Sequence, residues 1–153
     1  MHPKKIQFWD LIAAAGGVLL AIGVFLPWYK ANPDNRNAVV AGVHGAGVSA
    51  WNAHHLLRYL FLVVAIAPLI LLYIIVRDHE LSWPRGELTA VIGIVAFGLA
   101  GYLGVIDRPG TPKGEVSLQF GWFVAMLGIL LLMGGGAGRA GTTERPRKPP
   151  GVL

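Results

Sequence analysis

Four long apolar segments constrain the fold of this chain more than any other feature. They cover residues 8–28, 56–76, 88–106 and 120–138. They contain no histidine and only two charged residues, Asp10 near the start of the first segment and Arg58 near the start of the second. A hydrocarbon core of about 30 Å needs roughly 20 helical residues. None of the segments shows a polar face with a helical period, which is typical of helices surrounded by apolar groups. The segments therefore predict an all-α membrane protein, a bundle of four transmembrane helices.

The composition of the 153 residues supports a bilayer as the solvent. The chain is 54% hydrophobic and 14% charged, whereas soluble domains carry about 25% charged residues. A chain this short buries only a limited fraction of its surface, so it cannot hide the apolar excess in a soluble core. The 21 glycines suit closely packed membrane helices.

Cysteine and charge exclude several classes of function. The chain has no cysteine, which excludes disulfides, thiol nucleophiles and Cys-ligated metals. The net charge is +5, but the 13 Lys and Arg are spread over the ends of the apolar segments rather than gathered on one face. We therefore expect anionic lipid headgroups, not nucleic acid, as the partner of these cations.

The first segment has two interpretations. Lys4 and Lys5 followed by an apolar run are compatible with a cleaved signal peptide ending at Ala31. However, Tyr29 stands where a small residue is required, and the run is longer than usual for a signal peptide. We expect an uncleaved first helix and a domain of four spans covering residues 1–138.

The distribution of Lys and Arg predicts the orientation. With the N-terminus in the cytoplasm, eight of the 13 fall on the inner side and five on the outer side. This favours a multi-pass protein of the plasma membrane with both termini cytoplasmic, and a disordered basic tail over residues 139–153. The inner set is Lys4, Lys5, Arg77, Arg85, Arg139, Arg145, Arg147 and Lys148, and the outer set is Lys30, Arg36, Arg58, Arg108 and Lys113.

Aromatic residues gather at the predicted ends of the spans. The first span closes with the sequence FLPWYK, in which Pro27 stops the helix and Trp28 and Tyr29 follow it. Amphipathic rings are enriched where hydrocarbon gives way to headgroups. All five tryptophans lie near such ends, so we interpret them as an interfacial aromatic belt: Trp9, Trp28, Trp51, Trp83 and Trp122.

Small residues recur at intervals of three or four in three of the spans. Lipid does not drive helices together, so close contact between small residues must do so. One interpretation is packing within a four-helix bundle; the other is docking to another membrane protein or to a second copy. The stripes are Ala13, Gly17 and Ala21; Ala96, Ala100 and Gly104; and Gly121, Ala125 and Gly128.

Two of the loops contain strand signals. Loop 1, between the first and second spans, contains the sequence NAVVAGVHGAGVSAW, in which β-branched residues alternate with glycines; this suggests a hairpin turning near HGAG. Loop 3, between the third and fourth spans, contains the sequence EVSL, which resembles an edge strand. We predict a small extracytoplasmic hairpin or sheet formed from loops 1 and 3. Ser49 is the expected N-cap of the helix that leads into the second span.

We predict no catalytic, cofactor-binding or metal-binding residue. His44, His54 and His55 are the clustered imidazoles, but neighbouring residues point about 100° apart on a helix, so His54 and His55 cannot chelate from one face. Asp10 would be a functional candidate if it entered the membrane, yet its place near the inner headgroups favours a helix-dipole role. Arg58 is expected to extend to the outer headgroups.

The motifs FLPWY and GVSAWNA resemble those of small four-helix membrane proteins of actinobacteria, a group without an assigned activity. The layout also resembles that of claudins, with two inner termini and a long first outer loop. The chain lacks the cysteine pair and the GLW signature of that family, so the resemblance does not carry over a junction role.

Two classes of function remain. The first is a non-enzymatic scaffold or accessory subunit of a membrane complex, which would contact other membrane proteins or itself through the small-residue faces. The second is a transporter or channel component acting as an oligomer, because four helices without a buried charge offer no polar pathway of their own. A lipid-modifying enzyme would rest on the histidines alone, and we expect no enzyme.

Overall fold

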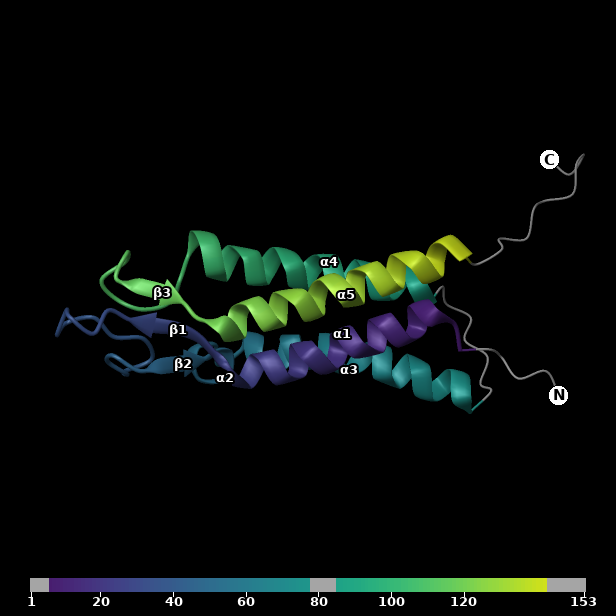
Figure 1. The fold of residues 1–153 in the computed structure, drawn as a ribbon, viewed down its shortest axis with the longest axis horizontal. Helices are drawn as coiled ribbons and strands as arrows, with labels where there is room; N and C mark the ends of the chain where they lie inside the picture. Colours follow the sequence, from purple (N-terminus) through teal and green to yellow (C-terminus); the bar gives the residue numbers. More distant parts are fainter. Residues whose placement is uncertain (1–5, 78–84, 143–153) are drawn as a thin grey trace, which may run out of the picture.

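Four long helices lie side by side, and a small sheet covers one end of them (Figure 1). The computed structural model describes residues 6–77 and 85–142. The long helices are α1 (Phe8–Phe25), α3 (Leu57–Val76), α4 (Arg85–Gly101), which continues into the π-helix η1 (Tyr102–Ile106), and α5 (Phe120–Thr142); α2 (Ala50–Ala53) is a single turn. By length and composition, each of the four can cross a membrane.

The helix ends differ from the predicted ones by three or more residues at three places. Helix α4 begins at Arg85 rather than at residue 88. Helix α1 ends at Phe25 rather than at residue 28, because Leu26 precedes a proline and is extended. Helix α5 continues to Thr142, so residues 139–142 of the predicted disordered tail are helical. The rest of that predicted tail, 143–153, lies outside the described residues.

Helices α1 and α5 touch through their backbones. A Cβ atom added at Gly16 would lie 2.5 Å from the carbonyl oxygen of Gly128, and one added at Gly135 would lie 2.5 Å from the nitrogen of Ala13. Helix α4 approaches α5 in the same way, with Gly86 against Gly136. The small-residue stripes therefore pack inside the bundle, as the first interpretation predicted.

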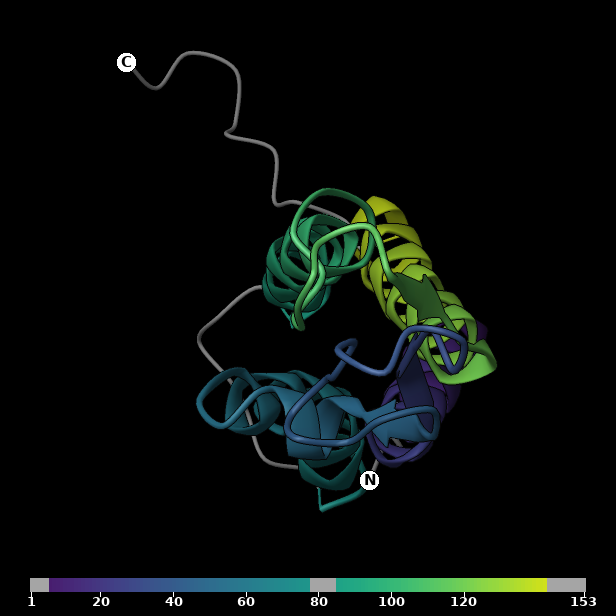
Figure 2. The ribbon, with the colours of Figure 1, turned by 90° about the vertical axis from the view of Figure 1, so that its left-hand side faces the viewer.

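The bundle is not closed all round. Figure 2, seen from the sheet end, shows α4 beside α5 and α3 beside α1. Helix α3 meets α1 where Gly17 faces the backbone of Ala65 and the ring of Pro68. Helices α3 and α4 make few contacts with each other, which leaves a seam between them.

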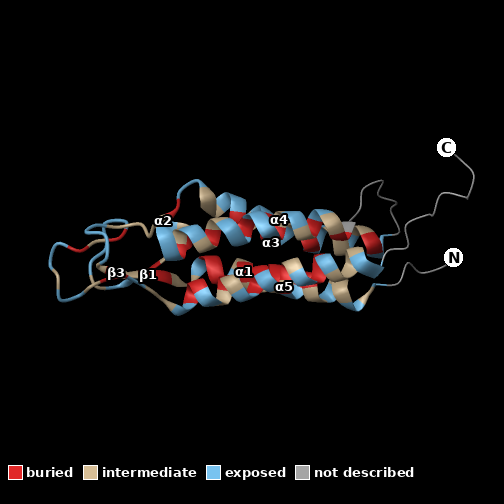
Figure 3. Ribbon diagram, turned by 90° about the horizontal axis from the view of Figure 1, so that it is seen from above, coloured by how far each residue is buried: buried red, intermediate tan, exposed pale blue. Residues whose placement is uncertain are grey.

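Large apolar side chains point outward from every long helix. Figure 3 shows buried residues on the inner faces of the helices and exposed ones on the outer faces. Such a surface would be unfavourable in water and is the normal surface of a protein in lipid. Examples from the four helices are Val18, Ile22, Val63, Ile70, Val91, Ile94, Phe123 and Leu127.

The predicted sheet from loops 1 and 3 is present. Its strands are β1 (Pro27–Ala31), β2 (Gly47–Ser49) and β3 (Val116–Leu118), arranged antiparallel in the order β2-β1-β3. The predicted turn near HGAG is wrong: the chain reverses three residues earlier, at Ala41 and Gly42, which both have positive φ. Ser49 is an N-cap as predicted, accepting a hydrogen bond from the nitrogen of Asn52 at 3.3 Å. The helix that it caps does not lead into the second span: α2 ends at Ala53, and α3 begins separately at Leu57.

The interpretation of the tryptophans as an aromatic belt is wrong for two of them. Trp9 and Trp51 are half-buried. Trp28 and Tyr29 are fully buried, because β1 passes beneath the other loops, and Trp122 is nearly so. The buried indoles donate to backbone carbonyls, Trp28 to Gly23 at 2.7 Å and Trp122 to Ala100 at 2.9 Å. Trp83 lies outside the described residues.

The contact between α1 and α5 predicts opposite effects for two glycines of α5. Gly128→Ala places a Cβ 2.6 Å from the nitrogen of Leu20 and should destabilise the protein by about 1–3 kcal/mol, as overpacking does. Gly134→Ala is the matched control: it meets no atom within 4 Å and removes a helix-interior glycine, so it should be neutral or stabilising. Thermal unfolding in detergent measures both, and equal effects would contradict the packing.

Candidate functional site

The sheet end of the bundle contains a buried polar cluster around the hydroxyl of Tyr29. This hydroxyl lies 2.8 Å from Nε2 of His54 and donates to the carbonyl oxygen of Leu103 at 3.3 Å. Since tyrosine has one O–H, donation to Leu103 requires His54 to donate from Nε2. Tyr29 thus connects three parts of the chain: strand β1, the segment before α3, and the π-helix that ends α4.

Aromatic rings enclose this cluster. Trp28 makes edge contacts with His54 and Tyr29, at centroid distances of 6.3 and 6.1 Å, and it also packs on Phe61 of α3. Pro27 ends α1 directly before these residues, so β1 turns Trp28 and Tyr29 inward over the helix ends. The surroundings of the hydrogen bonds are therefore largely apolar.

Burial changes the acid–base properties of the pair. Removal from water lowers the pKa of His54 below its ordinary value of 6.5, because the charged imidazolium is poorly solvated there. The same desolvation raises the pKa of Tyr29, an effect that the positive charge of Arg108 partly opposes. Both groups are neutral at pH 7, and they act as a hydrogen-bonded connection rather than as a charged site.

Arg108 fixes the chain where it leaves the π-helix. Its guanidinium donates from Nε to the carbonyl of Gly104 at 2.6 Å and from Nη1 to that of Val116 at 2.7 Å. The carbonyls at a helix C-terminus lack partners within the helix, so Arg108 satisfies one of them and ties α4 to β3. The ring of Trp122 occupies the space in which a side chain at residue 104 would lie.

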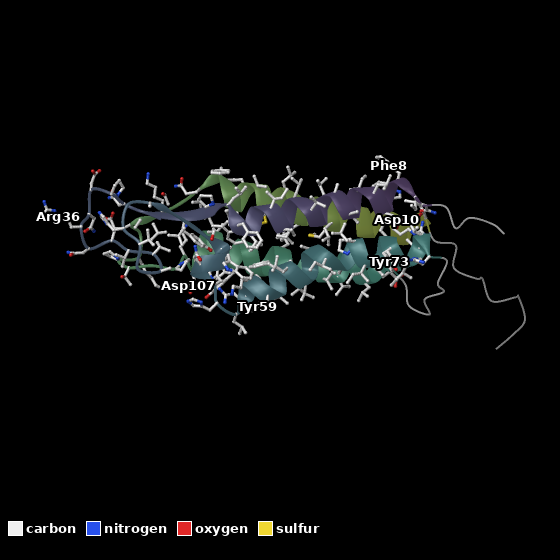
Figure 4. The ribbon with its side chains drawn as sticks, turned by 90° about the horizontal axis from the view of Figure 1, so that it is seen from below. Phe8, Asp10, Arg36, Tyr59, Tyr73 and Asp107 are labelled. Atoms are coloured by element: carbon white, nitrogen blue, oxygen red, sulfur yellow. The ribbon has the colours of Figure 1, made fainter. Side chains whose placement is uncertain are left out.

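A pocket of about 220 Å³ opens beside Arg108. We call it the loop pocket; its lining consists of Val105, Ile106, Arg108, Lys113, Gly114 and Val116. Lys113 forms an exposed ion pair with Asp107, with 2.7 Å between Nζ and Oδ1. Asp107 lies at the sheet end of the bundle, and Arg36 lies beyond it at the tip of the loops (Figure 4).

Arg58 lies between two aromatic rings at the start of α3. Its Cζ atom is 4.5 Å from the centroid of Trp51 and 4.9 Å from that of Tyr59. Nη1 donates to the carbonyl of Trp51 and Nη2 to the hydroxyl of Tyr59. These contacts explain the position of Arg58 at the predicted membrane surface, and no bound ligand is needed to explain it.

The opposite end of the bundle contains an ion pair between the first and last helices. Oδ2 of Asp10 lies 3.4 Å from Nη1 of Arg139, and both side chains are largely buried. The same carboxylate accepts a hydrogen bond from the nitrogen of Gln7 at 2.9 Å. Asp10 thus lies at the N-terminus of its helix as expected, and the cation that pairs with it is Arg139.

A small cavity adjoins this pair between the four helices. Its volume is about 20 Å³, and besides Asp10 and Arg139 it is lined by Pro68 of α3 and Thr89 of α4. A volume of this size corresponds to about one water molecule. The charges therefore face an interior space too small for an organic substrate.

The structure does not bring His44, His54 and His55 together as a site. His54 contacts Tyr29, Nδ1 of His44 lies 2.8 Å from the carbonyl of Ala38, and His55 is exposed. Within residues 6–77 and 85–142, no group of three or more His, Cys, Asp or Glu is placed to hold a metal ion. Sequence reasoning missed the roles of Tyr29, Arg108 and Arg139, because each depends on a partner distant in the sequence.

The burial of His54 predicts a pH dependence of stability. At mildly acidic pH the unfolded chain binds more protons than the folded one, so the stability should fall as the pH drops below 6.5. His54→Gln should weaken this dependence, since glutamine does not titrate and can still hydrogen-bond to Tyr29. His55→Gln is the matched control, because His55 is exposed. Unfolding midpoints in detergent at pH 7.5 and 5 test this, and an undiminished pH dependence in His54→Gln would contradict it.

No protein family, curated protein or solved structure matches this chain. The resemblance to small actinobacterial four-helix proteins and to the claudin layout therefore remains a prediction, and the arguments for function rest on the residues and their geometry.

Proposed function

We propose that this protein is a small integral membrane protein of the plasma membrane that acts as a non-enzymatic scaffold or accessory subunit of a membrane complex. The observation that carries the proposal is the seam between α3 and α4. Both helices pack on the α1–α5 pair, but they scarcely pack on each other. Leu71 and Leu72 on α3 and Thr89 on α4 line the small space that the two helices share.

A seam of this kind suits a helix of another membrane protein. Association in lipid depends on close packing between helices rather than on hydrophobicity. A partner helix in the seam could contact two helices at once, whereas the outer faces of α1 and α5 each offer one. The sheet and the Arg108 contacts hold the ends of the helices, so the seam has fixed borders for docking.

The polar groups described above support a structural role. Trp28, Trp122, Tyr29 and Arg108 each donate to a backbone carbonyl. These bonds connect helix ends to one another and to the sheet. In this proposal the sheet end is extracytoplasmic and both termini are cytoplasmic, in agreement with the distribution of Lys and Arg.

The alternative is a transporter or channel component acting as an oligomer. The observation that favours it is the largely buried pair of Asp10 and Arg139 beside a cavity, since ionisable residues inside a membrane are candidates for function. A cavity of about 20 Å³ is too small for a pathway within one chain, so this alternative needs several copies.

Cross-linking from defined positions tests the scaffold. A photo-reactive amino acid at Leu71 or Leu72, which line the space that α3 shares with α4, should give adducts with one partner protein in native membranes. Matched controls on the outward faces of α1 and α5 are Val18, Ile22, Phe123 and Leu127, which should give adducts mainly with lipid. Adducts only with further copies of the chain would favour the oligomeric alternative. Equal partner adducts from all six positions would contradict docking at the seam.

A further inference from the structure

The loop pocket differs from the rest of the sheet end because its lining combines two cations with apolar walls. It lies where the π-helix ends and the chain folds back toward β3. Its volume of about 220 Å³ is many times that needed for one water molecule. It therefore has room for a polar group larger than water.

Arg108 is held in place with hydrogen-bonding capacity to spare. Its two bonds, to the carbonyls of Gly104 and Val116, use two of the five N–H groups of a guanidinium. Because both acceptors are backbone atoms, the guanidinium is fixed before any ligand arrives. A fixed planar guanidinium is well suited to phosphate, which it can bind through two parallel hydrogen bonds.

The two carboxylates of the same loop have other contacts. Oε2 of Glu115 accepts a hydrogen bond from Asn32 at 2.7 Å. Asp107 pairs with Lys113, and this bond raises the pKa of the lysine. The pair is exposed, so it is held weakly and Lys113 can turn toward an anion in the pocket. Neither acid contributes to the lining, which carries a positive charge.

The apolar walls indicate what is attached to the anion. Val105 is 68% and Ile106 is 74% exposed, although both belong to a helix that is long and apolar enough to cross a membrane. Hydrocarbon would lie against them if α4 spans a bilayer, directly below the two cations. A free phosphate ion would contact the cations alone, whereas a phospholipid would contact both.

We propose that the loop pocket binds the phosphate of an anionic phospholipid of the surrounding leaflet, with an acyl chain along Val105 and Ile106. The guanidinium of Arg108 holds the phosphate oxygens, and Lys113 adds a second positive charge. The inference requires that α4 lies in a bilayer, but it does not depend on the scaffold role or on the seam.

Native mass spectrometry of the purified, delipidated full chain measures the binding. The probe is phosphatidylglycerol, and the comparison lipid is phosphatidylcholine with the same acyl chains. The intact protein should bind phosphatidylglycerol more tightly. Glycerol phosphate and inorganic phosphate at millimolar concentration should not displace it, because they lack the acyl chain. Equal binding of the two lipids, or displacement by inorganic phosphate, would overturn the proposal.

Variants locate the site. Arg108→Gln should weaken phosphatidylglycerol binding about tenfold or more, as the loss of a charge-assisted hydrogen bond does. Lys113→Gln should weaken it by about threefold, and Asp107→Asn should strengthen it by a similar factor because it releases Lys113. Arg36→Gln is the matched control, which removes a positive charge from the tip of the loops at the same end of the molecule, outside the pocket lining.

These variants separate a site from a general charge effect. Arg108 also ties α4 to β3, so its substitution could lower stability. The ion pair of Lys113 and Asp107 is exposed, so substituting either residue should leave the thermal midpoint unchanged. Loss of binding in Arg36→Gln equal to that in Lys113→Gln, or weaker binding in Asp107→Asn, would overturn the proposal even if Arg108→Gln behaved as expected.

Discussion

The backbone contact between α1 and α5 is the interaction on which the other parts of the fold depend. Lipid is as apolar as the side chains of these helices, so their association relies on close packing. Glycines on both helices remove the side chains that would keep the two backbones apart. Helix α4 then packs on α5 and helix α3 on α1, while α3 and α4 stay apart.

The same contact explains why a sheet forms at one end. Gly121, at the start of α5, lies against Leu26 and the carbonyl of Pro27 at the end of α1. The strands that leave these two helix ends, β1 and β3, therefore run beside each other and pair. Side-chain donors then reach carbonyls near the helix ends. The indole of Trp28 donates to the carbonyl of Gly23, which also accepts from the nitrogen of Leu26, and Tyr29 and Arg108 donate to carbonyls of the π-helix.

The parts of the fold that follow from local composition were predictable from the sequence. The four helices follow from the length of the apolar segments, and β2 and β3 from the β-branched residues of the two outer loops. The central strand β1 was missed, because its sequence PWYKA contains no β-branched residue and was interpreted as the end of the first span. The burial of Trp28 and Tyr29 was not predictable, because an aromatic residue after a span has the same local sequence whether it faces headgroups or lies beneath a sheet. The helical end of α5 was missed because GGGAGRAG has low helix propensity. Gly135 and Gly136 are retained there because they touch α1 and α4.

The candidate sites were less predictable for the same reason. The pairing of Asp10 with Arg139 joins the two ends of the chain, and the position of Arg108 depends on a π-helix that no periodicity indicates. Both arise from tertiary contacts. The histidines attract attention in the sequence, yet of His44, His54 and His55 the structure places only His54 in a buried network, as the partner of a tyrosine.

The central claim is that lipid surrounds the middle of the bundle, and single-cysteine labelling tests it most directly. The natural chain has no cysteine, so each variant reports one position. In sealed cells, a membrane-impermeant maleimide should label Arg36→Cys. It should not react with Val18→Cys, even though Val18 is exposed on the surface of α1 and even after the membrane is opened without detergent. Rapid labelling of Val18→Cys in the intact membrane would show that water, not lipid, surrounds α1, and would contradict the account.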